Sequence, residues 1–474
     1  MPQPNVLVVC TDQQRPDWLS PTDLPLETPA LESLAERGTR FEETVCPTPV
    51  CNPCRASLTA GMEYDRCGVP NNEVAYPSER GTLYSRLRDD AGYHVAGTGK
   101  FDLTPTYELG RDGEPEPEWG FSAARFTPAK NDTVYRIDET DPEPRDPYTA
   151  YLAEEGLLET HVQDYHSRNA LTDTFPTPLP QEAYYDNWIT RQGQSLIEDA
   201  PEDRPWFLQV NLQNPHDPWD VTEAMHDRFR EPDVEFPEPV DSDGDVDAES
   251  HQEVRRNYAA MVEHLDSCLA ALVDTVQARG ELDETVVVFC SDHGEMLGDY
   301  GQWKKDSPLT PSVGVPFVIA GPGIDDRNPV EQPTTLLDLY ATVLDYAGLD
   351  TADVDSRSMR PFLEGSGDLP REVVYSGLST WRMVYDGRFK LVRGYDPERR
   401  RGTAYEPRGI EPAEVTRLLA QRDPVLYDTD QGESENVAAE YPAVVERLTD
   451  RLETIRGRPE AEGWGWVGPA RRDN

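Results

Sequence analysis

Two short apolar runs, far apart in the chain, constrain the fold more than any other feature of the sequence. Residues 5–10 (NVLVVC) and 285–290 (TVVVFC) have the length of strands and contain many β-branched residues. Apolar runs without polar alternation are typical of parallel strands that are buried on both faces. Because predicted helices and strands alternate between the two runs, we expect an α/β fold in which helices sandwich a mostly parallel sheet.

The periodicity of the remaining chain predicts one large domain followed by a smaller one. Helices are expected over residues 28–41, 83–90, 184–197, 255–279 and 336–347, and strands over 94–96, 206–210 and 316–320. Residues 104–180 are acidic and proline-rich in places, and we expect a variable region there. After residue 370, apolar alternation around Asp386-Gly387 indicates a hairpin. We therefore expect an α/β domain over 1–370 and a C-terminal α+β subdomain with an antiparallel sheet over 371–474.

The composition limits the partners of this chain. Its formal net charge is −46, and only five of its 44 basic residues are lysines. Such a surface resembles that of proteins from salt-in halophiles, in which salt screens the self-repulsion. It argues against nucleic acid and anionic membranes as partners. The seven cysteines form no paired framework, no leader precedes the first strand, and no apolar run reaches membrane-spanning length. We therefore expect a cytoplasmic protein, whose oligomeric state stays open.

The segment from Cys51 to Gly61 is predicted to form a short helix that begins with reactive side chains. Pro53 suits the first turn of a helix, and Gly61 suits its C-terminal stop. Cys51 would then lie at a helix N-terminus, where free backbone N–H groups favour an anion, and Arg55 would lie one turn along. By themselves, Cys51 and Cys54 are equally compatible with ordinary thiols, a redox pair or half of a zinc site. No second Cys/His cluster completes such a zinc site.

An acidic cluster follows each of the two apolar runs. Asp12-Gln13 follows the first run, and Asp292-His293 follows the second. Because the carboxyl ends of parallel strands meet at one edge of a sheet, we expect these side chains to converge. Two carboxylates and an amide are typical ligands of a hard cation. The alternative is that each aspartate caps the helix after it, which is the better interpretation of either cluster alone. The two clusters together, with Cys51, favour the metal site.

These motifs resemble those of the type I sulfatases, a family within the alkaline phosphatase superfamily. Cys51-x-Pro53-x-Arg55 is similar to the family signature, although serine is commoner at the position of Cys54. In that family a formylglycine-generating enzyme oxidises the signature cysteine to formylglycine, whose hydrate attacks a sulfate ester. The resemblance implies one divalent cation, with calcium favoured over manganese, magnesium or zinc. Its implied ligands are Asp12, Gln13, the formylglycine made from Cys51, Asp292 and His293.

Three further matches extend the resemblance over most of the chain. Lys100, in Gly-Lys-Phe-Asp-Leu, resembles a lysine that contacts sulfate; Asp102 replaces the usual histidine of this motif. His216 resembles a histidine near the leaving-group oxygen, and Lys305 resembles a second sulfate-binding lysine. The catalytic residues implied in this way are Cys51, Arg55, Lys100, Asp102, His216 and Lys305. Other expected pocket residues are Tyr64, Asn72 and Trp219. Tyr300 and Gly314 stand where the family usually has His and Arg, which indicates a divergent subfamily.

The resemblance implies a metal-dependent hydrolase of a small-molecule or carbohydrate sulfate ester. Two alternatives remain open at this point. Gln13 and His293 are similar to their counterparts in phosphonate monoester hydrolases, so a phosphonate monoester or phosphodiester is a second substrate class. Asp102 and Tyr300 in place of histidines also motivate a non-catalytic binding relative. Retention of Cys51, Arg55, Asp12, Asp292 and Lys305 argues against that last alternative.

Overall fold

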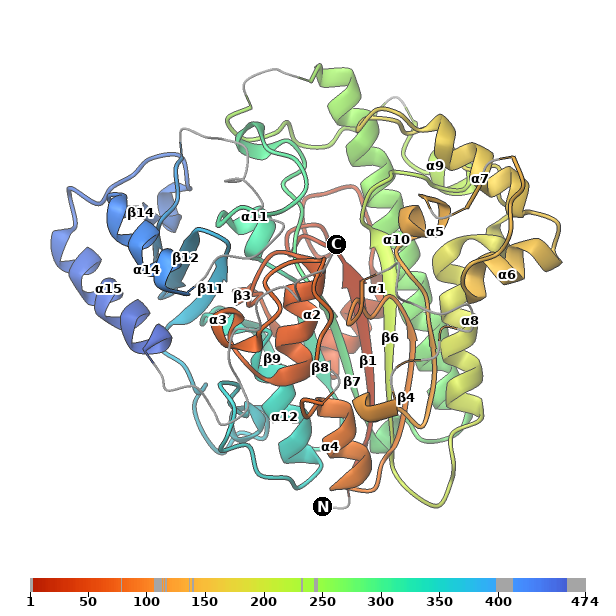
Figure 1. The fold of residues 1–474 in the computed structure, drawn as a ribbon, viewed down its shortest axis with the longest axis horizontal. Coiled ribbons are helices and arrows are strands. Elements are labelled where there is room, and N and C mark those ends of the chain that lie inside the picture. Colours follow the sequence, from red (N-terminus) through yellow and green to blue (C-terminus); the bar gives the residue numbers. More distant parts are fainter. Residues whose placement is uncertain are drawn as a thin grey trace, which may run out of the picture.

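A central sheet of eight strands organises the chain in the computed structural model (Figure 1). The structure describes residues 3–77, 79–105, 113, 115, 117–135, 137–138, 140–231, 233–242, 246–397 and 412–457. The strand order is β5-β4-β6-β1-β7-β8-β2-β9. These strands are β1 (Asn5–Asp12), β2 (Gly38–Phe41), β4 (His94–Gly99), β5 (Ala123–Phe126), β6 (Trp206–Pro215), β7 (Thr285–Ser291), β8 (Phe317–Ala320) and β9 (Arg327–Val330). A separate pair consists of β3 (Thr44–Val45) and β10 (Thr334–Thr335).

Most neighbouring strands of the central sheet are parallel, which confirms the expected fold class. Strand β1 lies between β6 and β7 and runs parallel to both. Strands β4 and β5 continue the parallel half of the sheet, whereas β8 runs antiparallel to β7 and β2. The two apolar runs singled out from the sequence are therefore adjacent strands at the centre of the sheet.

Helices cover both faces of the sheet. Along β1, Val6 and Val8 point into one apolar cluster, and Leu7 and Val9 point into the other. Helices α2, α4 and α12 contribute to the first cluster, and α1, α8 and α10 to the second (Figure 1). The helices are α1 (Pro29–Glu36), α2 (Cys51–Ala60), α3 (Tyr64–Cys67), α4 (Leu83–Asp89), α5 (Lys130–Tyr135), α6 (Pro147–Glu154), α7 (Leu158–Ser167), α8 (Tyr185–Glu198), α9 (Glu223–Asp227), α10 (Ala248–Ala278), α11 (Thr310–Val313), α12 (Asp338–Tyr346), α13 (Arg360–Leu363), α14 (Pro412–Gln421) and α15 (Pro442–Arg456). Burial on both faces explains the unbroken apolar run of β1.

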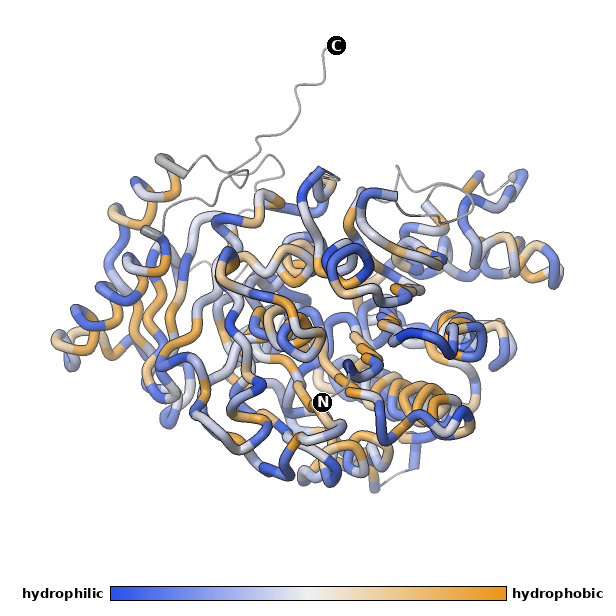
Figure 2. Tube along the Cα trace, turned by 90° about the horizontal axis from the view of Figure 1, so that it is seen from below, coloured by the Kyte–Doolittle hydropathy of each residue, from blue (hydrophilic) through white to orange (hydrophobic). Residues whose placement is uncertain are grey.

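A four-stranded antiparallel sheet follows the central sheet, as expected for the C-terminal part. Its strands are β11 (Val374–Leu378), β12 (Trp381–Tyr385), β13 (Phe389–Arg393) and β14 (Val425–Asp428), in that order. Helix α15 packs Leu448 and Leu452 against Val384 and Leu391 on one face of this sheet. Seen from below in Figure 2, these strands are mainly orange, whereas many rim loops are blue. This hydropathy pattern gives the C-terminal sheet a core of its own.

Some predicted boundaries were wrong. Residues 28–41 form two elements, since α1 ends at Glu36 and β2 begins at Gly38. Residues 38–41 pair with β8, and the two strands approach so closely that a Cβ atom on Gly38 would lie 2.2 Å from the Ile319 carbonyl oxygen. Helix α10 begins seven residues before the predicted start, because the Asp247 side chain accepts the Ser250 N–H as its N-cap. The variable region contains α5, α6 and α7, which its composition had obscured.

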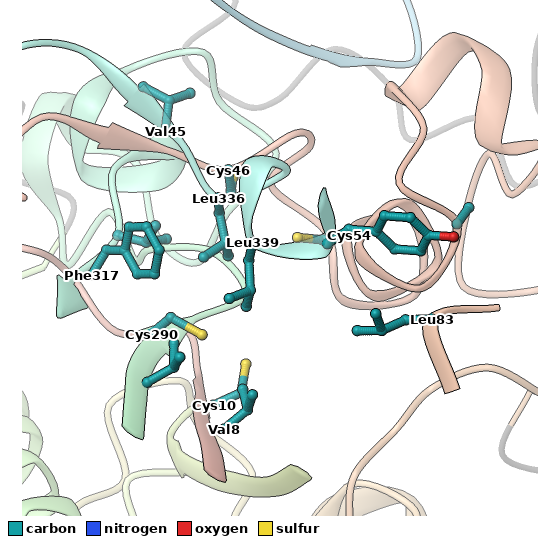
Figure 3. Packing of buried hydrophobic residues seen from close by; sticks show 14 of the residues in the cluster. Val8, Cys10, Val45, Cys46, Cys54, Leu83, Cys290, Phe317, Leu336 and Leu339 are labelled. Atoms are coloured by element: carbon teal, nitrogen blue, oxygen red, sulfur yellow. The ribbon is translucent and has the colours of Figure 1, made fainter. Parts of the chain in front are cut away.

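Helix α2 is nearly completely buried, and its packing fixes the position of Cys51. Nine of its ten residues are buried, and it ends at Gly61 in a left-handed conformation, as predicted. Figure 3 shows Cys54 of α2 in one apolar layer with Leu339 and the strand residues Cys10 and Cys290. Cys10 and Cys290 are direct neighbours on β1 and β7. The underside of α2 therefore packs next to the two strands whose ends carry the acidic clusters. Within the described residues, no helix is both long and apolar enough to span a bilayer.

Candidate active site

The two acidic clusters meet at the carboxyl end of the central sheet, as predicted. Asp12 is the last residue of β1, and Asp292 directly follows β7. The strands are in register up to Thr11 and Ser291, so the two aspartates lie side by side. The Gln13 N–H donates to Asp292 Oδ1 at 3.2 Å. Sheet register therefore places both carboxylates in one site, and no described helix begins directly after either aspartate.

Four buried side chains form a cluster with the geometry of a metal site. The ligand atoms of Asp12, Cys51, Asp292 and His293 all lie within 4.8 Å of one another. Cys51 Sγ lies 3.2 Å from His293 Nε2 and 3.9 Å from Asp12 Oδ1. Two carboxylates, an imidazole and a sulfur position at this separation can converge on one cation.

His293 is held with one nitrogen toward this cluster. Its Nδ1 lies 3.1 Å from the Gly294 carbonyl oxygen, to which only a protonated Nδ1 can donate. The unprotonated Nε2 then lies 3.6 Å from Asp292 Oδ1 and 3.2 Å from Cys51 Sγ. Burial lowers the pKa of His293, which keeps the ring neutral. A neutral imidazole with its free nitrogen turned toward the carboxylates is the form that binds a metal.

Gln13 directly follows Asp12, and its backbone N–H contacts the cluster at Asp292 Oδ1. Its Nε2 donates to Glu295 Oε2 and lies 3.5 Å from Asp217 Oδ1, so the amide nitrogen is committed to two carboxylates. Its Oε1 is buried and has no hydrogen-bond partner among the described residues. Gln13 also has a left-handed backbone, with φ of 68°. A buried amide oxygen that has no partner among the described residues, on the residue that follows Asp12, is a candidate metal ligand.

Glu295 is a buried carboxylate that the sequence analysis did not single out. Its Oε1 accepts the Leu297 and Lys304 backbone N–H groups at 2.9 and 2.5 Å. Burial raises its pKa to about 7. Glu295 thus connects Gln13 to the loop that carries Lys305. Its position directly after Asp292-His293-Gly294 was the available sequence signal.

Arg55 and Lys100 supply positive charge to the same carboxylates. Arg55 donates from Nε to Asp292 Oδ2 at 2.9 Å and from Nη2 to Asp12 Oδ2 at 3.2 Å. Its Nη1 donates to the Lys100 carbonyl oxygen at 2.7 Å, and Lys100 Nζ in turn pairs with Asp12. Burial by itself would raise the pKa of Asp12, but the charges around it, with Lys100 first, hold that pKa well below its usual value. Asp12 is therefore ionised.

Lys305 and His216 also lie next to Cys51. Lys305 Nζ lies 3.0 Å from Cys51 Sγ and 2.8 Å from His216 Nε2. Since an ammonium group only donates, His216 Nε2 accepts this hydrogen bond, and Nδ1 donates to the Asp217 carbonyl oxygen at 2.6 Å. Burial opposes the charge of Lys305, but Cys51 and Asp12 outweigh it and raise the pKa of Lys305. The lysine is a cation within reach of position 51.

Cys51 opens into a small polar cavity of about 230 Å³. Asp102 lies on its wall, 3.3 Å from Lys100 Nζ, and burial raises the pKa of this carboxyl. The half-exposed Lys304 also lines the cavity and pairs with Asp217 at 3.1 Å. The lining residues are Cys51, Asn52, Asn72, Lys100, Asp102, Thr104, Pro105, Ala129, Asn131, Asp132, His216, Lys304 and Lys305.

Expectations for the cavity wall were partly wrong. Asn72 lines the cavity, and its Oδ1 accepts the Asn52 N–H at 3.1 Å. Trp219 and Tyr64 do not line it. Trp219 is fully buried beside α10 and donates to the Leu171 carbonyl, and the Tyr64 hydroxyl donates to the Pro70 carbonyl. Both rings are large and mostly apolar, so they pack in the hydrophobic core, and the sequence around them does not predict which residues bury them.

The cavity also contains side chains that the sequence analysis missed. Asn131 and Asp132 reach it from α5, and Thr104 reaches it from the segment after β4. These residues belong to the variable region, whose composition gave no periodic signal. Asp217 was also missed, although it directly follows His216. A charged residue after a buried strand was the only signal available for it.

Comparison with known proteins agrees with this geometry. Residues 4–349 match the family model described as Sulfatase. A choline-sulfatase from Rhizobium meliloti (strain 1021) is 30% identical over 470 residues, which cover 89% of this chain and 86% of that protein. An arylsulfatase from Clostridium perfringens (strain 13 / Type A) is 24% identical over 400 residues, covering 79% of this chain and 81% of that one.

The fold is also similar to that of solved structures. The phosphonate monoester hydrolase of Agrobacterium radiobacter superposes with a TM-score of 0.75 at 23% identity, covering 96% of this chain and 95% of that one. Because the two sequences are only 23% identical, this similarity supports the fold and not a shared activity. The family match spans the strands that carry Asp12 and Asp292 as well as helix α2. The chain therefore belongs to the sulfatase family and is a hydrolase of sulfuric esters.

Proposed function

We propose that this enzyme hydrolyses a small organic sulfate monoester, with a divalent cation and a formylglycine made from Cys51 at its centre. The observation that carries the proposal is the position of Cys51 Sγ. It lies within 4 Å of a carboxylate, an imidazole and an ammonium group, at the floor of a polar cavity. No other described cysteine belongs to a metal-ligand cluster of this kind.

The residues present fit a divalent cation. Asp12, Gln13 and Asp292 offer three oxygens, and His293 offers one nitrogen; the unpaired Gln13 oxygen is the specific sign of a missing partner. Such a cation would neutralise the oxygens of the transferring group as a Lewis acid. The three oxygens suit calcium or manganese, whereas the imidazole suits a transition metal such as zinc. Elemental analysis of protein from the native host identifies the metal.

Position 51 would hold the nucleophile. Formylglycine there would supply, as its hydrate, a hydroxyl group that attacks sulfur, and a second hydroxyl group that later expels sulfate. A transient partner, the formylglycine-generating enzyme, would make it from Cys51. Lys305 Nζ and His293 Nε2 already lie 3.0 and 3.2 Å from the atom that this group replaces. Lys305 and His293 would therefore orient a hydroxyl group at position 51.

The side chains around position 51 have distinct proposed roles. Lys100, Arg55 and Lys305 attract the anionic sulfate and stabilise the charge that grows on its oxygens. Lys305 and His216 share a hydrogen bond, and this pair holds the proton that the departing alcohol takes up. Asp102, on the cavity wall beside Lys100, accepts the proton that the second hydroxyl group releases.

The charge of the site suits a monoanionic ester. Arg55 and Lys100 pair with the carboxylates of Asp12, Asp292 and Asp102, and Lys305 beside Cys51 adds a third positive charge, so these three cations and three carboxylates balance one another. A divalent ion would then leave an excess of two positive charges. A sulfate monoester carries one negative charge, and as the bond to the leaving group loosens, negative charge develops on the departing oxygen. An excess of positive charge favours that transition state over the bound ester.

A second substrate class is favoured by Gln13 and His293. Phosphonate monoesters and phosphodiesters also carry one negative charge, so the cations of the site do not discriminate against them. The choice between sulfur and phosphorus esters is decided by turnover of an aryl sulfate, an aryl phosphonate monoester and an aryl phosphodiester by one preparation. Faster turnover of the sulfate supports the main proposal, and a preference for either phosphorus ester overturns it.

The role of Cys51 is tested by mass spectrometry and by a matched pair of variants. We expect formylglycine at position 51 in protein from the native host. Cys51→Ala should lower turnover by at least about 1,000-fold, because it removes the nucleophile. Cys268→Ala, at an equally buried thiol on α10, should retain turnover. An unmodified thiol in active protein contradicts the proposal, as does full activity of Cys51→Ala.

We also propose a reducing, cytoplasmic compartment. All seven cysteines of the chain are free and buried, which is typical of proteins that stay among reductants. Thiol titration of denatured protein from the native host should find no disulfide. A disulfide in that protein contradicts the assignment.

A further inference from the structure

Lys305, one of the proposed catalytic residues, lies in an unusual stretch of backbone. Its two neighbours, Lys304 and Asp306, have φ angles of 67° and 78°. Neither is glycine, and a left-handed conformation is unfavourable for residues with a Cβ atom. Two such residues around one lysine persist only where the surrounding structure holds them. The loop from Gln302 to Leu309 therefore needs anchors on both sides of Lys305.

The first anchor comes from the segment that follows β7. Glu295 Oε1 accepts the Lys304 N–H at 2.5 Å, and the Lys304 carbonyl oxygen accepts the Met296 N–H at 2.7 Å. These contacts fix the backbone before Lys305. They do not reach Asp306, whose left-handed conformation needs a separate cause.

The second anchor comes from the C-terminal sheet. The indole Nε1–H of Trp381 donates to the Asp306 carbonyl oxygen at 3.2 Å. Trp381 is the first residue of β12, and its side chain is fully buried. A large, rigid and inaccessible side chain is well suited to fix a backbone atom, because its own position is determined by packing. The contact lies one residue away from Lys305.

A buried ion pair of the C-terminal sheet continues this second anchor. Lys390, on β13, is 1% exposed and pairs with Glu433. Lys390 Nζ donates to Thr310 Oγ1 at 2.7 Å, and Glu433 Oε2 accepts the Thr310 N–H at 2.7 Å. Thr310 begins α11, directly after the loop. The pair therefore holds both the side chain and the backbone at the end of the loop that carries Lys305.

We propose that the C-terminal sheet positions Lys305, with Trp381 as the principal positioning residue and the Lys390–Glu433 pair as its support. This inference rests on the proposed role of Lys305 in sulfate ester hydrolysis. It assigns the proposed subdomain over 371–474 a part in catalysis, since contacts from two of its strands hold the loop. Lys305 itself contacts position 51 and His216, so a small shift of the loop moves its ammonium group relative to both.

The test compares two tryptophans that make one indole hydrogen bond each. Trp381→Phe removes the donor to Asp306. Trp206→Phe is the matched control, because Trp206 is 2% exposed and donates from Nε1 to Glu281 Oε2 at 2.9 Å, at the opposite end of the central sheet. A misplacement of about 1 Å is sufficient to lower turnover by about 100-fold. We expect Trp381→Phe to lower kcat by about 10- to 100-fold with little change in KM, and Trp206→Phe to leave kcat unchanged.

The leaving group provides a readout that a general loss of stability would not affect. Because Lys305 and His216 serve the departing oxygen, the loss in Trp381→Phe should be larger for phenyl sulfate than for the better leaving group of nitrophenyl sulfate. The double variant Lys390→Met, Glu433→Gln should show the same trend to a smaller degree, since removing both charges leaves no unpaired buried ion. A kcat of Trp381→Phe within two-fold of that of Trp206→Phe overturns the inference.

A crystal structure of Trp381→Phe separates this inference from the proposed function. We expect Lys305 Nζ to move by about 1 Å or more from the atom at position 51. An unchanged separation of 3.0 Å overturns the positioning role, whatever ester the enzyme hydrolyses. Conversely, absence of sulfatase activity in the wild-type enzyme overturns the proposed function, and the displacement of Lys305 still decides the inference.

Discussion

The hydrogen bond between Gln13 and Glu295 leads to a prediction about metal affinity. Glu295 Oε2 accepts the Gln13 amide N–H, and Oε1 accepts two backbone N–H groups. In Glu295→Gln, the new amide oxygen can keep both backbone contacts, but the new NH₂ group then faces the NH₂ group of Gln13. This contact between two donors is relieved only if the Gln13 amide turns over, which exchanges the positions of its oxygen and its nitrogen.

The expected magnitude follows from the role of Glu295 as a partner of a metal ligand. Loss of such a partner lowers metal affinity by about 10- to 100-fold, or about 1.4 to 2.8 kcal/mol. The measurement is calorimetric titration of metal-free protein with calcium and with manganese, in concentrated salt. The double variant Gln13→Glu, Glu295→Gln should recover most of the affinity, because a carboxylate at position 13 accepts from the new amide and still offers an oxygen.

A matched control removes a buried carboxylate elsewhere. Asp266 is 6% exposed, and its carboxylate accepts the backbone N–H groups of Ala30 and Leu31 at 3.0 and 2.8 Å. Asp266→Asn should bind the metal like the wild type, although it loses stability. If Glu295→Gln binds both metals within three-fold of the wild-type affinity, the proposed orientation of the Gln13 oxygen is wrong. Failure of the double variant to recover affinity would refute the donor–acceptor explanation.

Four further predictions follow from other parts of the structure. Burial lowers the pKa of His161 from 6.5 to about 4, so the free energy of unfolding falls as the pH drops below 6.5. When the pH is lowered from about 8 to about 5, the wild type should lose about 2 kcal/mol more unfolding free energy than His161→Phe, as measured by denaturant titration; equal losses would contradict this. Burial raises the pKa of Asp102, so activity should fall as the pH drops through that raised value; Asp102→Asn should lower kcat about 100-fold and remove this limb of the pH–rate profile, and a retained limb would assign it to another group. In Gly99→Ala, the new Cβ would lie 2.0 Å from the Asn211 carbonyl oxygen, at a φ of 89°, so the free energy of unfolding from denaturant titration should fall by at least about 2 kcal/mol; in Gly92→Ala, where the new Cβ meets open space, it should fall by about half of that or less. The net charge of −46 predicts that raising potassium chloride from about 0.2 M to about 3 M shifts the urea midpoint upward, and a midpoint that stays constant would exclude a halophilic surface.

Local patterns were sufficient to predict the elements that build the site. The unbroken apolar runs identified β1 and β7 because burial on both faces leaves no room for polar alternation. Pro53 and Gly61 marked helix α2, since each is favoured by the backbone conformation at one end of a helix. The hairpin around Asp386-Gly387 was visible for the same reason. Each of these signals depends on a few neighbouring residues only.

Signals that depend on distant partners were absent or misleading. Residues 38–41 became a strand because β8 pairs with them, and no local pattern reports such a pairing. Tyr64 and Trp219 were expected in the pocket but are core residues. Asn131, Asp132 and Thr104 line the cavity although their own segments showed no periodicity.

The sequence by itself determined which side chains are available for chemistry and which elements carry them. Cys51 at the start of a helix, and acids after two buried strands, could be identified because local backbone preferences and burial leave their mark on neighbouring residues. Only the tertiary structure decided that the Gln13 oxygen has no partner among the described residues, that Lys305 reaches Cys51, and that Trp381 contacts the loop that carries Lys305. These are contacts between residues tens to hundreds of positions apart, and their distances are set by how sheets and helices pack, which no short stretch of chain encodes.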